Sequence, residues 1–262
     1  EGKAAPERVY EREGAFAPGN QVQIIAHDYL PARKFAFLCG LNRREEGGAG
    51  GVGGDIQLTS TALGKSQFFE GFTACFGRLR TSEEAAEIDV FAYCEKTRLA
   101  GKLTVSEIGA AAAGQKFKQV IEMAYPEGHE ADFPLFMSVD AQLGLLFLLT
   151  KAGLLFLFEL TEGALLLRSR VSDTPLIMGC PTSALHGCLV LSKPGNLISI
   201  TVDEQPFVDF VRGAGHIKNN ALLARKLAVR AGLPGSEAVY LERFNALFGA
   251  GELDAAAKAV AR

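Results

Sequence analysis

The chain has 262 residues, of which 48% are hydrophobic, and its 27 basic and 30 acidic side chains give a net charge of −3. This composition is too apolar and too weakly charged for a disordered chain. The charge balance argues against a protein that grips nucleic acid through its phosphates, because that mode of binding needs a surplus of Lys and Arg. The five cysteines form no C-x-x-C pair. They indicate small buried thiols in a reduced, cytosolic protein.

The two ends of the chain predict a piece of a longer protein. Residues 1–16 are charged, lack the apolar run of a signal peptide and do not begin with Met, and the last residues stop inside a helical pattern. The one membrane-like stretch, 143–160, is interrupted by Thr150, Lys151 and Gly153. Each apolar run is therefore far shorter than the ~20 residues of a membrane span. Two buried strands joined by a tight turn explain this stretch better.

From about residue 20 to 205 the chain predicts repeated β-hairpins, because short runs of Val, Ile, Leu and Phe alternate with turn residues. The clearest pair is 147–160 and 190–202, which superpose so that Lys151 falls on Lys193 and Gly153 falls on Gly195. Glycine at that position can take the positive φ that such a turn needs.

Two further hairpins are expected upstream. Residues 90–108 form one with a longer loop, and 34–40 pairs with 55–61 in the other. Four such units, spaced by roughly 40–55 residues, favour a β-propeller, since blades repeat at about that period. Four blades alone would leave an open arc.

After about residue 205 the spacing becomes helical. One helix is expected to start at Asn219 or Asn220 and to stop at Gly232, and a second to start at Ser236. This second helix carries Tyr240, Phe244 and Leu247 or Phe248 at helical spacing and ends at Gly249, and Asp254 opens a third. Successive short helices of this kind predict the start of an α-solenoid behind the β domain.

The search for chemistry finds no catalytic, cofactor or metal site, and we expect a binding or structural protein, not an enzyme. The glycine run 48–53 has the spacing of a dinucleotide loop but lacks the following helix, so a hairpin tip is favoured. His186 lies close to Cys188, and a turn followed by a buried thiol is preferred to a nucleophile pair. Glu83 and Glu84 are expected in a solvated loop.

Several segments resemble one family in colinear order. Residues 132–163, with their Asp-Phe-Pro start and Lys-x-Gly turn, resemble the last blades of the clathrin heavy chain terminal domain. Residues 243–261, with Phe-Asn-Ala-Leu-Phe and Ala-Ala-Lys, resemble the helical linker that follows that propeller, and 22–40 and 223–244 also fit. The chain is thus similar to a divergent clathrin heavy chain over essentially its whole length.

This resemblance implies a mainly β fold with C-terminal α structure. Residues 1–205 would form a partial seven-bladed β-propeller (blades four to seven), and 206–262 would begin the α-zigzag linker. The family is a structural component of the coat of coated pits and vesicles in endocytosis and intracellular transport, on the cytoplasmic face of the membrane. Implied partners are adaptor and accessory proteins with short linear motifs. Other heavy chains and light chains would bind through segments outside this chain, and no nucleic acid or cofactor is implied.

Two peptide sites of the family map onto this sequence. In the pocket for Trp-containing motifs the matching residues are Gln23 and Ile25, whose amide and apolar side chain suit a peptide backbone and an aromatic anchor. Without the resemblance, Ile24 and Ile25 would be interpreted as core residues of a strand.

The second site is the groove between blades four and five, which takes leucine-rich loops. The matching residues are Phe35, Leu58, Leu63 and Gln67. The family has Trp where Phe35 stands and Arg where Leu63 stands, and the loss of Arg removes a cation and several donors. Phe35 and Leu58 can equally serve as blade packing.

Two other classes remain open. One is a propeller-plus-solenoid subunit of another vesicle coat or a tethering complex, which would share the architecture but not the linker match. The other is an enzyme built on a propeller, for which no residue cluster in the sequence argues.

Overall fold

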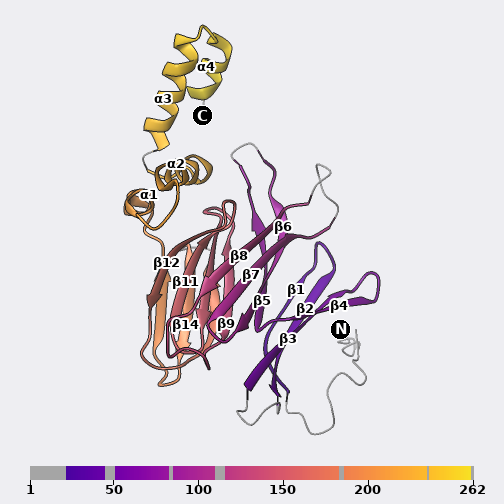
Figure 1. The fold of residues 1–262 in the computed structure, drawn as a ribbon. Coiled ribbons are helices and arrows are strands. Elements are labelled where there is room, and N and C mark those ends of the chain that lie inside the picture. Colours follow the sequence, from indigo (N-terminus) through magenta and orange to yellow (C-terminus); the bar gives the residue numbers. More distant parts are fainter. Residues whose placement is uncertain are drawn as a thin grey trace, which may run out of the picture.

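The structure is a computed structural model that describes residues 22–44, 51–82, 85–109, 116–182, 186–234 and 236–260. Its strands form four antiparallel sheets in chain order, and helices follow the last sheet (Figure 1). The expected mainly β chain, with a partial propeller of about four blades and C-terminal helices, is confirmed. Residues 48–50 of the glycine run and the pair Glu83 and Glu84 lie outside the described residues. The rest of that run, 51–53, was expected in a hairpin tip but begins a strand instead.

Each sheet is a meander of neighbouring strands. The first holds β1 (Val22–Leu30), β2 (Phe35–Arg44), β3 (Gly51–Ser60) and β4 (Lys65–Glu70). The second holds β5 (Thr73–Leu79), β6 (Ile88–Thr97), β7 (Ala100–Glu107) and β8 (Lys118–Ala124). The third holds β9 (Pro134–Asp140), β10 (Leu145–Thr150), β11 (Leu154–Glu159) and β12 (Ala164–Arg170). The fourth holds β13 (Leu176–Thr182), β14 (Gly187–Ser192) and β15 (Leu197–Thr201).

The four predicted hairpins are the second and third strands of the four sheets, namely β2–β3, β6–β7, β10–β11 and β14–β15. The first strand of each sheet lies beside the first strand of the next, since β5 contacts both β1 and β9, and β9 contacts β13. Sheets arranged around their first strands in this way form an arc of propeller blades.

The strands β10 and β11 show why the most apolar stretch of the chain is not a membrane span. All twelve of their residues are buried. Leu145, Phe147 and Leu149 face a core cluster shared with the fourth sheet and the helices. The alternate residues Leu146 and Leu148 face the cluster shared with the second sheet. A strand covered on both faces needs apolar residues at every position, because successive side chains point to opposite faces.

The turns of the repeated hairpins confirm the alignment of Gly153 with Gly195. Their φ values are +88° and +96°. Both glycines therefore occupy the left-handed region that other residues avoid.

The hairpin within 90–108 differs from the expectation of a longer loop. β6 and β7 are joined by Arg98 and Leu99 alone, and Arg98 takes the positive φ, of 53°. Gly101, the next glycine, is inside β7, opposite Lys96. A Cβ on Gly101 would lie 2.7 Å from Cγ of Met123. This glycine therefore serves strand packing and not the turn.

The cysteine prediction is right for four residues and wrong for one. Cys39, Cys75, Cys94 and Cys188 are buried free thiols, whereas Cys180 is exposed. Cys180 lies on β13, where most side chains are exposed.

The helices are α1 (Glu204–Gly213), α2 (Asn220–Ala231), α3 (Ser236–Gly249) and α4 (Leu253–Val260). None of the described helices is both long and apolar enough to cross a membrane. The last three match the predicted helices, and Gly232 ends α2 in the left-handed conformation. The helix α1 was not predicted. It begins three residues after β15 ends and spans the predicted boundary between the two domains at residue 205. That boundary stays a prediction.

Of the two asparagines expected to cap α2, Asn219 does not. It stands at the N-cap position with φ +55°, but its side chain makes no capping hydrogen bond. The side chain of Asn220 accepts from the N–H of Ala221 (2.8 Å) and donates to the carbonyl oxygens of Arg212 (2.8 Å) and Ala214 (3.3 Å) at the end of α1. The two asparagines therefore shape the connection between the helices, and the side chain of Asn220 ties α2 to α1.

Candidate functional site

The two residues assigned to the Trp-motif pocket both lie on β1, but they differ in how far they are buried. Gln23 is exposed and pairs with Leu41 of β2. Ile25 lies in the register irregularity between Ile24 and Ala26, where it is half-buried against the core between the first two sheets. A bulge of this kind redirects a side chain.

Ile25 lines a cavity of about 470 Å³ along the first strands of all four sheets, and Gln23 does not. The wall of this cavity is mixed: Phe136, Met137 and Met178 are apolar, whereas Asp28 and Thr73 are polar. Apolar walls with a few polar groups suit one large side chain of a peptide. The structure thus brings Ile25 to this cavity and leaves Gln23, which is exposed, outside its lining.

The four residues of the second proposed groove gather at one end of the first sheet. Phe35 begins β2, Leu58 pairs with Gln67 across β3 and β4, and Leu63 lies in the turn between those strands. Phe35 and Leu58 are half-buried against the core shared with the second sheet. Gln67 is exposed, and Leu63 is 72% exposed. The set therefore has an apolar floor and an exposed rim.

An aromatic cluster lies behind that floor. Phe37 of β2 contacts the rings of Phe76 and Phe91 at centroid distances of 5.1 and 5.8 Å, and Phe69 contacts Tyr93 at 4.9 Å. Close aromatic pairs add to the burial energy of each ring. The boundary between the first two sheets is thus packed, and a ligand would bind at its end.

The interpretation of His186 and Cys188 as turn and buried thiol is confirmed. His186 lies in the turn before β14 with φ +47°. Burial raises the pKa of the Cys188 thiol to about 12, so it remains protonated and is a poor nucleophile. The ring of His186 instead contacts two carboxylates, those of Asp140 and Glu204.

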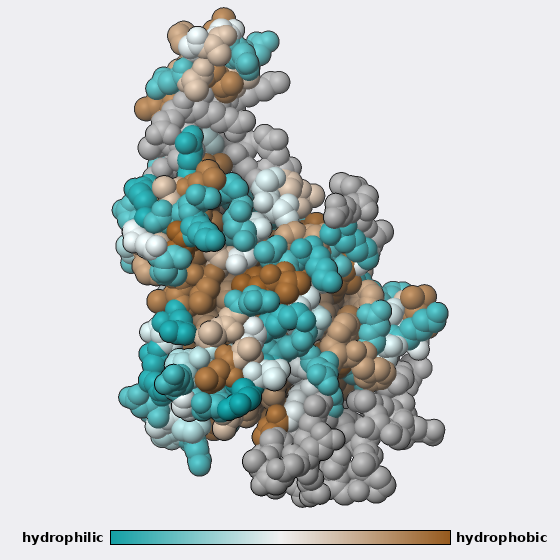
Figure 2. All heavy atoms as spheres, in the orientation of Figure 1, coloured by the Kyte–Doolittle hydropathy of each residue, from teal (hydrophilic) through white to brown (hydrophobic). Residues whose placement is uncertain are grey.

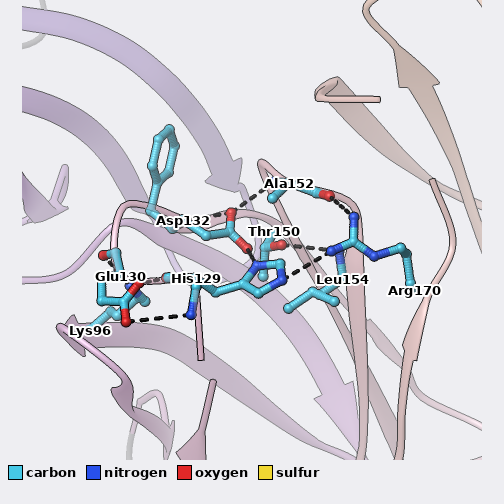
Figure 3. A network of polar contacts seen from close by, with 10 residues as sticks. Lys96, His129, Glu130, Asp132, Thr150, Ala152, Leu154 and Arg170 are labelled. Carbon is cyan, nitrogen blue, oxygen red and sulfur yellow. Dashed lines mark hydrogen bonds and ion pairs between the residues drawn. The ribbon is translucent and has the colours of Figure 1, made fainter. Parts of the chain in front are cut away.

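A polar network that the sequence did not reveal joins the second and third sheets (Figure 3). Asp132, almost buried, accepts hydrogen bonds from the backbone N–H of Phe133 (2.9 Å) and Ala152 (2.8 Å) and contacts Nδ1 of His129 (3.2 Å). Arg170 of β12 lies 3.0 Å from Nε2 of that histidine. Because an arginine only donates, Nε2 accepts and the proton of a neutral ring sits on Nδ1.

Lys96 ends the same network on the side of the second sheet. Its ammonium donates to the carbonyl oxygens of His129 (3.1 Å) and Glu130 (2.9 Å) and lies 4.7 Å from the centre of the Tyr125 ring. Burial lowers the pKa of Lys96, while the nearby Asp132 and Glu130 oppose that shift. These contacts fix the connection between β8 and β9.

The helices dock on the third sheet through a second set of polar contacts. Arg230 of α2 pairs with Glu159 at the end of β11 (2.8 Å) and donates to the carbonyl oxygen of Leu143 (2.6 Å). Nearby, Lys226 pairs with Glu162 (2.5 Å) at the edge of a cavity of about 520 Å³. Figure 2 shows hydrophobic residues in a band below the α1–α2 pair, where these helices meet the sheets. Among the described residues, no group of three His, Cys, Asp or Glu is placed to hold a metal ion.

The alignments with known protein sequences point to one family. The chain is 33% identical over 263 aligned positions to "Probable clathrin heavy chain 1" of Caenorhabditis elegans, and 28% identical to "Clathrin heavy chain" of Drosophila melanogaster. Both alignments cover 100% of this chain. A "Clathrin heavy chain 2" of Oryza sativa subsp. japonica is 30% identical over 95% of the chain. The chain spans about 15% of the length of these relatives.

No protein-family model matches the chain. Among solved structures, the β-propeller domain of Cps50 (Swd1) from Myceliophteria thermophila aligns with 79% of this chain over 70% of its own length, with a TM-score of 0.41 and 10% sequence identity. This structural similarity is too low to support a family assignment. The full-length alignments, in line with the arc of sheets and the helices behind it, make this chain a divergent relative of one segment of the clathrin heavy chains.

Proposed function

We propose that this chain is part of a heavy chain of a clathrin-type vesicle coat, in which it acts as scaffold and as docking surface for adaptor proteins. The observation that carries the proposal is the alignment of the whole chain with clathrin heavy chains, at up to 33% identity. The fold supports it, because the buried side chains serve contacts between sheets and between sheet and helix. The protein would work on the cytoplasmic face of coated pits and vesicles and would not be an enzyme.

The scaffold role can be tested with a chimera. The stretch of the Caenorhabditis elegans heavy chain that aligns with this chain is replaced by this chain, and coat assembly is measured by sedimentation. We expect the chimera to pellet as cages, since the sheet-to-helix junction sets the direction in which the following helices leave the propeller. A folded chimera that stays in the supernatant would contradict the scaffold role.

The docking role rests on the cavity next to Ile25 and on the rim at Leu63 and Gln67. Each would hold a short peptide motif weakly, and the many copies of a lattice would supply avidity of roughly 10²–10⁴. Light chains and further heavy chains would bind through segments outside this chain.

The Trp-motif pocket is tested by titrating a fluorescent Trp-motif peptide against a propeller that carries all its blades. We expect Gln23→Leu and Ile25→Gln each to weaken binding. Because Gln23 is exposed, the Gln23→Leu variant should fold normally. A loss of binding in that variant therefore cannot come from unfolding, whereas Ile25→Gln places an amide at a half-buried position and can destabilise the fold. Gln67→Leu, in the other proposed groove, is the matched control and should bind like the wild type. Unchanged affinity in both pocket variants would remove the assignment.

A further inference from the structure

A cavity of about 520 Å³ lies at the junction of the third sheet with the first two helices. One side of its wall comes from the turn after β11 and the start of β12, and the other side comes from the α1–α2 connection and from α2 itself. Figure 1 shows these two helices at one end of β11 and β12. We call this cavity the junction groove. None of the residues of the two peptide sites discussed above lines it.

The floor of the junction groove is apolar. Ile217 and Leu223 are buried, and Ala164 and Leu165 of β12 are half-buried. Leu222 stands at the edge of the groove and is 50% exposed. A cavity of this size takes a small ligand or a few side chains of a peptide, and an apolar floor favours apolar side chains.

The rim of the junction groove is basic. Lys218 and Lys226 both line it, and Glu162 is the one carboxylate among the described residues of its lining. Glu162 already pairs with Lys226, at 2.5 Å. Lys218 is exposed and has no ion pair with another side chain in the part of the chain that the structure describes. The rim therefore offers a positive charge that the described residues do not neutralise.

The sequence around the groove carries the same sign of charge. Residues 212–231 contain five Lys and Arg and no Asp or Glu, although the whole chain has a net charge of −3. The first turn of α2 consequently has no acidic residue to offset the positive end of the helix dipole. Arg212 and Arg230 are used within the fold, because they pair with Asp209 and Glu159. The remaining positive charge favours an anionic ligand over a cationic one.

We propose that the junction groove binds a short peptide segment of a partner protein that carries large apolar residues next to acidic residues. The apolar side chains lie on the floor of Ile217 and Leu223 and against Leu222, and a carboxylate of the peptide pairs with Lys218. The floor supplies affinity for any apolar segment, whereas the rim selects the acidic one. This inference does not rest on the coat function or on the two other peptide sites, because the groove is built from different residues.

The ligand chemistry is tested by fluorescence anisotropy with the full 262-residue chain and two labelled peptides. The first peptide has two leucines next to two glutamates in a background of glycine and serine, and the second has glutamines in place of the glutamates. We expect the acidic peptide to bind several-fold more tightly, and the difference to shrink at high salt, because salt screens exposed charges. Absence of binding by the acidic peptide, or equal affinity of the two peptides, would overturn the proposal.

Two variants test the location. Lys218→Gln should weaken binding of the acidic peptide about fivefold, the size of one exposed charge pair, and should leave the neutral peptide unaffected. Leu222→Ser should weaken binding of both peptides. Because both residues are exposed, the variants should fold normally, which circular dichroism checks.

The matched controls lie elsewhere on the surface. Lys193→Gln removes an exposed lysine from the turn between β14 and β15, and Gln67→Leu alters the groove at the end of the first sheet. Both controls should bind the acidic peptide like the wild type. If Lys218→Gln binds that peptide as tightly as the wild type, or if Gln67→Leu is the variant that loses binding, the junction groove is not the site.

Discussion

Arg230 of α2 and Glu159 of β11 form an ion pair that is closed off from water. Their Nη1 and Oε1 atoms are 2.8 Å apart, and the side chains are 5% and 0% exposed. Glu159 also accepts from the N–H of Thr161 (3.1 Å) and of Glu162 (2.8 Å). A buried carboxylate with this many donors is tolerated only while its partner remains in place.

We expect Arg230→Ala to destabilise the chain by about 3–5 kcal/mol, since it leaves a buried charge unpaired. The measurement is the free energy of unfolding from urea titration. Lys226→Ala is the matched control on the same helix, because it removes an exposed pair with Glu162 and should cost no more than about 1 kcal/mol. Equal losses in the two variants would show that the buried pair does not hold the helices.

The glycines of the repeated turns offer a second test, because equivalent positions have different surroundings. Gly195→Ala meets no neighbouring atom and should cost only the strain of a positive φ, about 1–2 kcal/mol. Gly153→Ala has the same strain, but its Cβ would also collide with the carbonyl oxygen of Ser172. We expect thermal unfolding to show a clearly larger loss for Gly153→Ala. A larger loss for Gly195→Ala would be inconsistent with the packing of the third sheet.

The sequence predicted the parts of the fold that depend on local pattern. The alternation of apolar and turn residues identified the hairpin formed by the second and third strands of each sheet, and Gly153 and Gly195 fixed two of its turns. The first strand of each sheet, the strands β4, β8 and β12, and α1 were missed. β15 and α1 are separated by two residues only, and Asp203, which caps the helix, lies in a run that reads as the end of a strand.

The candidate sites were less predictable, because their geometry depends on contacts between distant segments. Ile25 lines a cavity at an irregularity in β1 that no sequence pattern predicts. His186 meets Asp140 across 46 residues and Arg230 meets Glu159 across 71. A single sequence shows the charge of such residues but not their partners.

Cysteine reactivity gives a third prediction. Cys180 should react with a thiol reagent in the folded chain, whereas the four buried cysteines should react only after unfolding. Burial raises the pKa of Cys39 and of Cys188 to about 12, from 9.0 for a free thiol. Since the unfolded chain releases these protons first, the contribution of these thiols to stability should be constant below pH 9 and should fall between pH 9 and 12.

That fall is measured as the free energy of unfolding at pH 7, 9 and 10. Cys39→Ala and Cys188→Ala should each reduce the slope above pH 9, while Cys180→Ala should leave it unchanged. A slope that is independent of all three would mean that other groups cause the alkaline loss.

The last prediction concerns the rim of the groove at the end of the first sheet. Leu63 is 72% exposed in the turn between β3 and β4, so Leu63→Arg should fold normally. The new guanidinium would stand beside the apolar floor of Phe35 and Leu58 and offer several donors to a ligand. We expect it to raise the affinity for a leucine-rich loop peptide with a neighbouring acidic residue by roughly fivefold, the size of one exposed charge pair. The gain should vanish when that acid is replaced by its amide, and Leu63→Gln is the control for polarity without charge. Fluorescence anisotropy provides the measurement, and a gain that survives loss of the acid would place the peptide elsewhere on the surface.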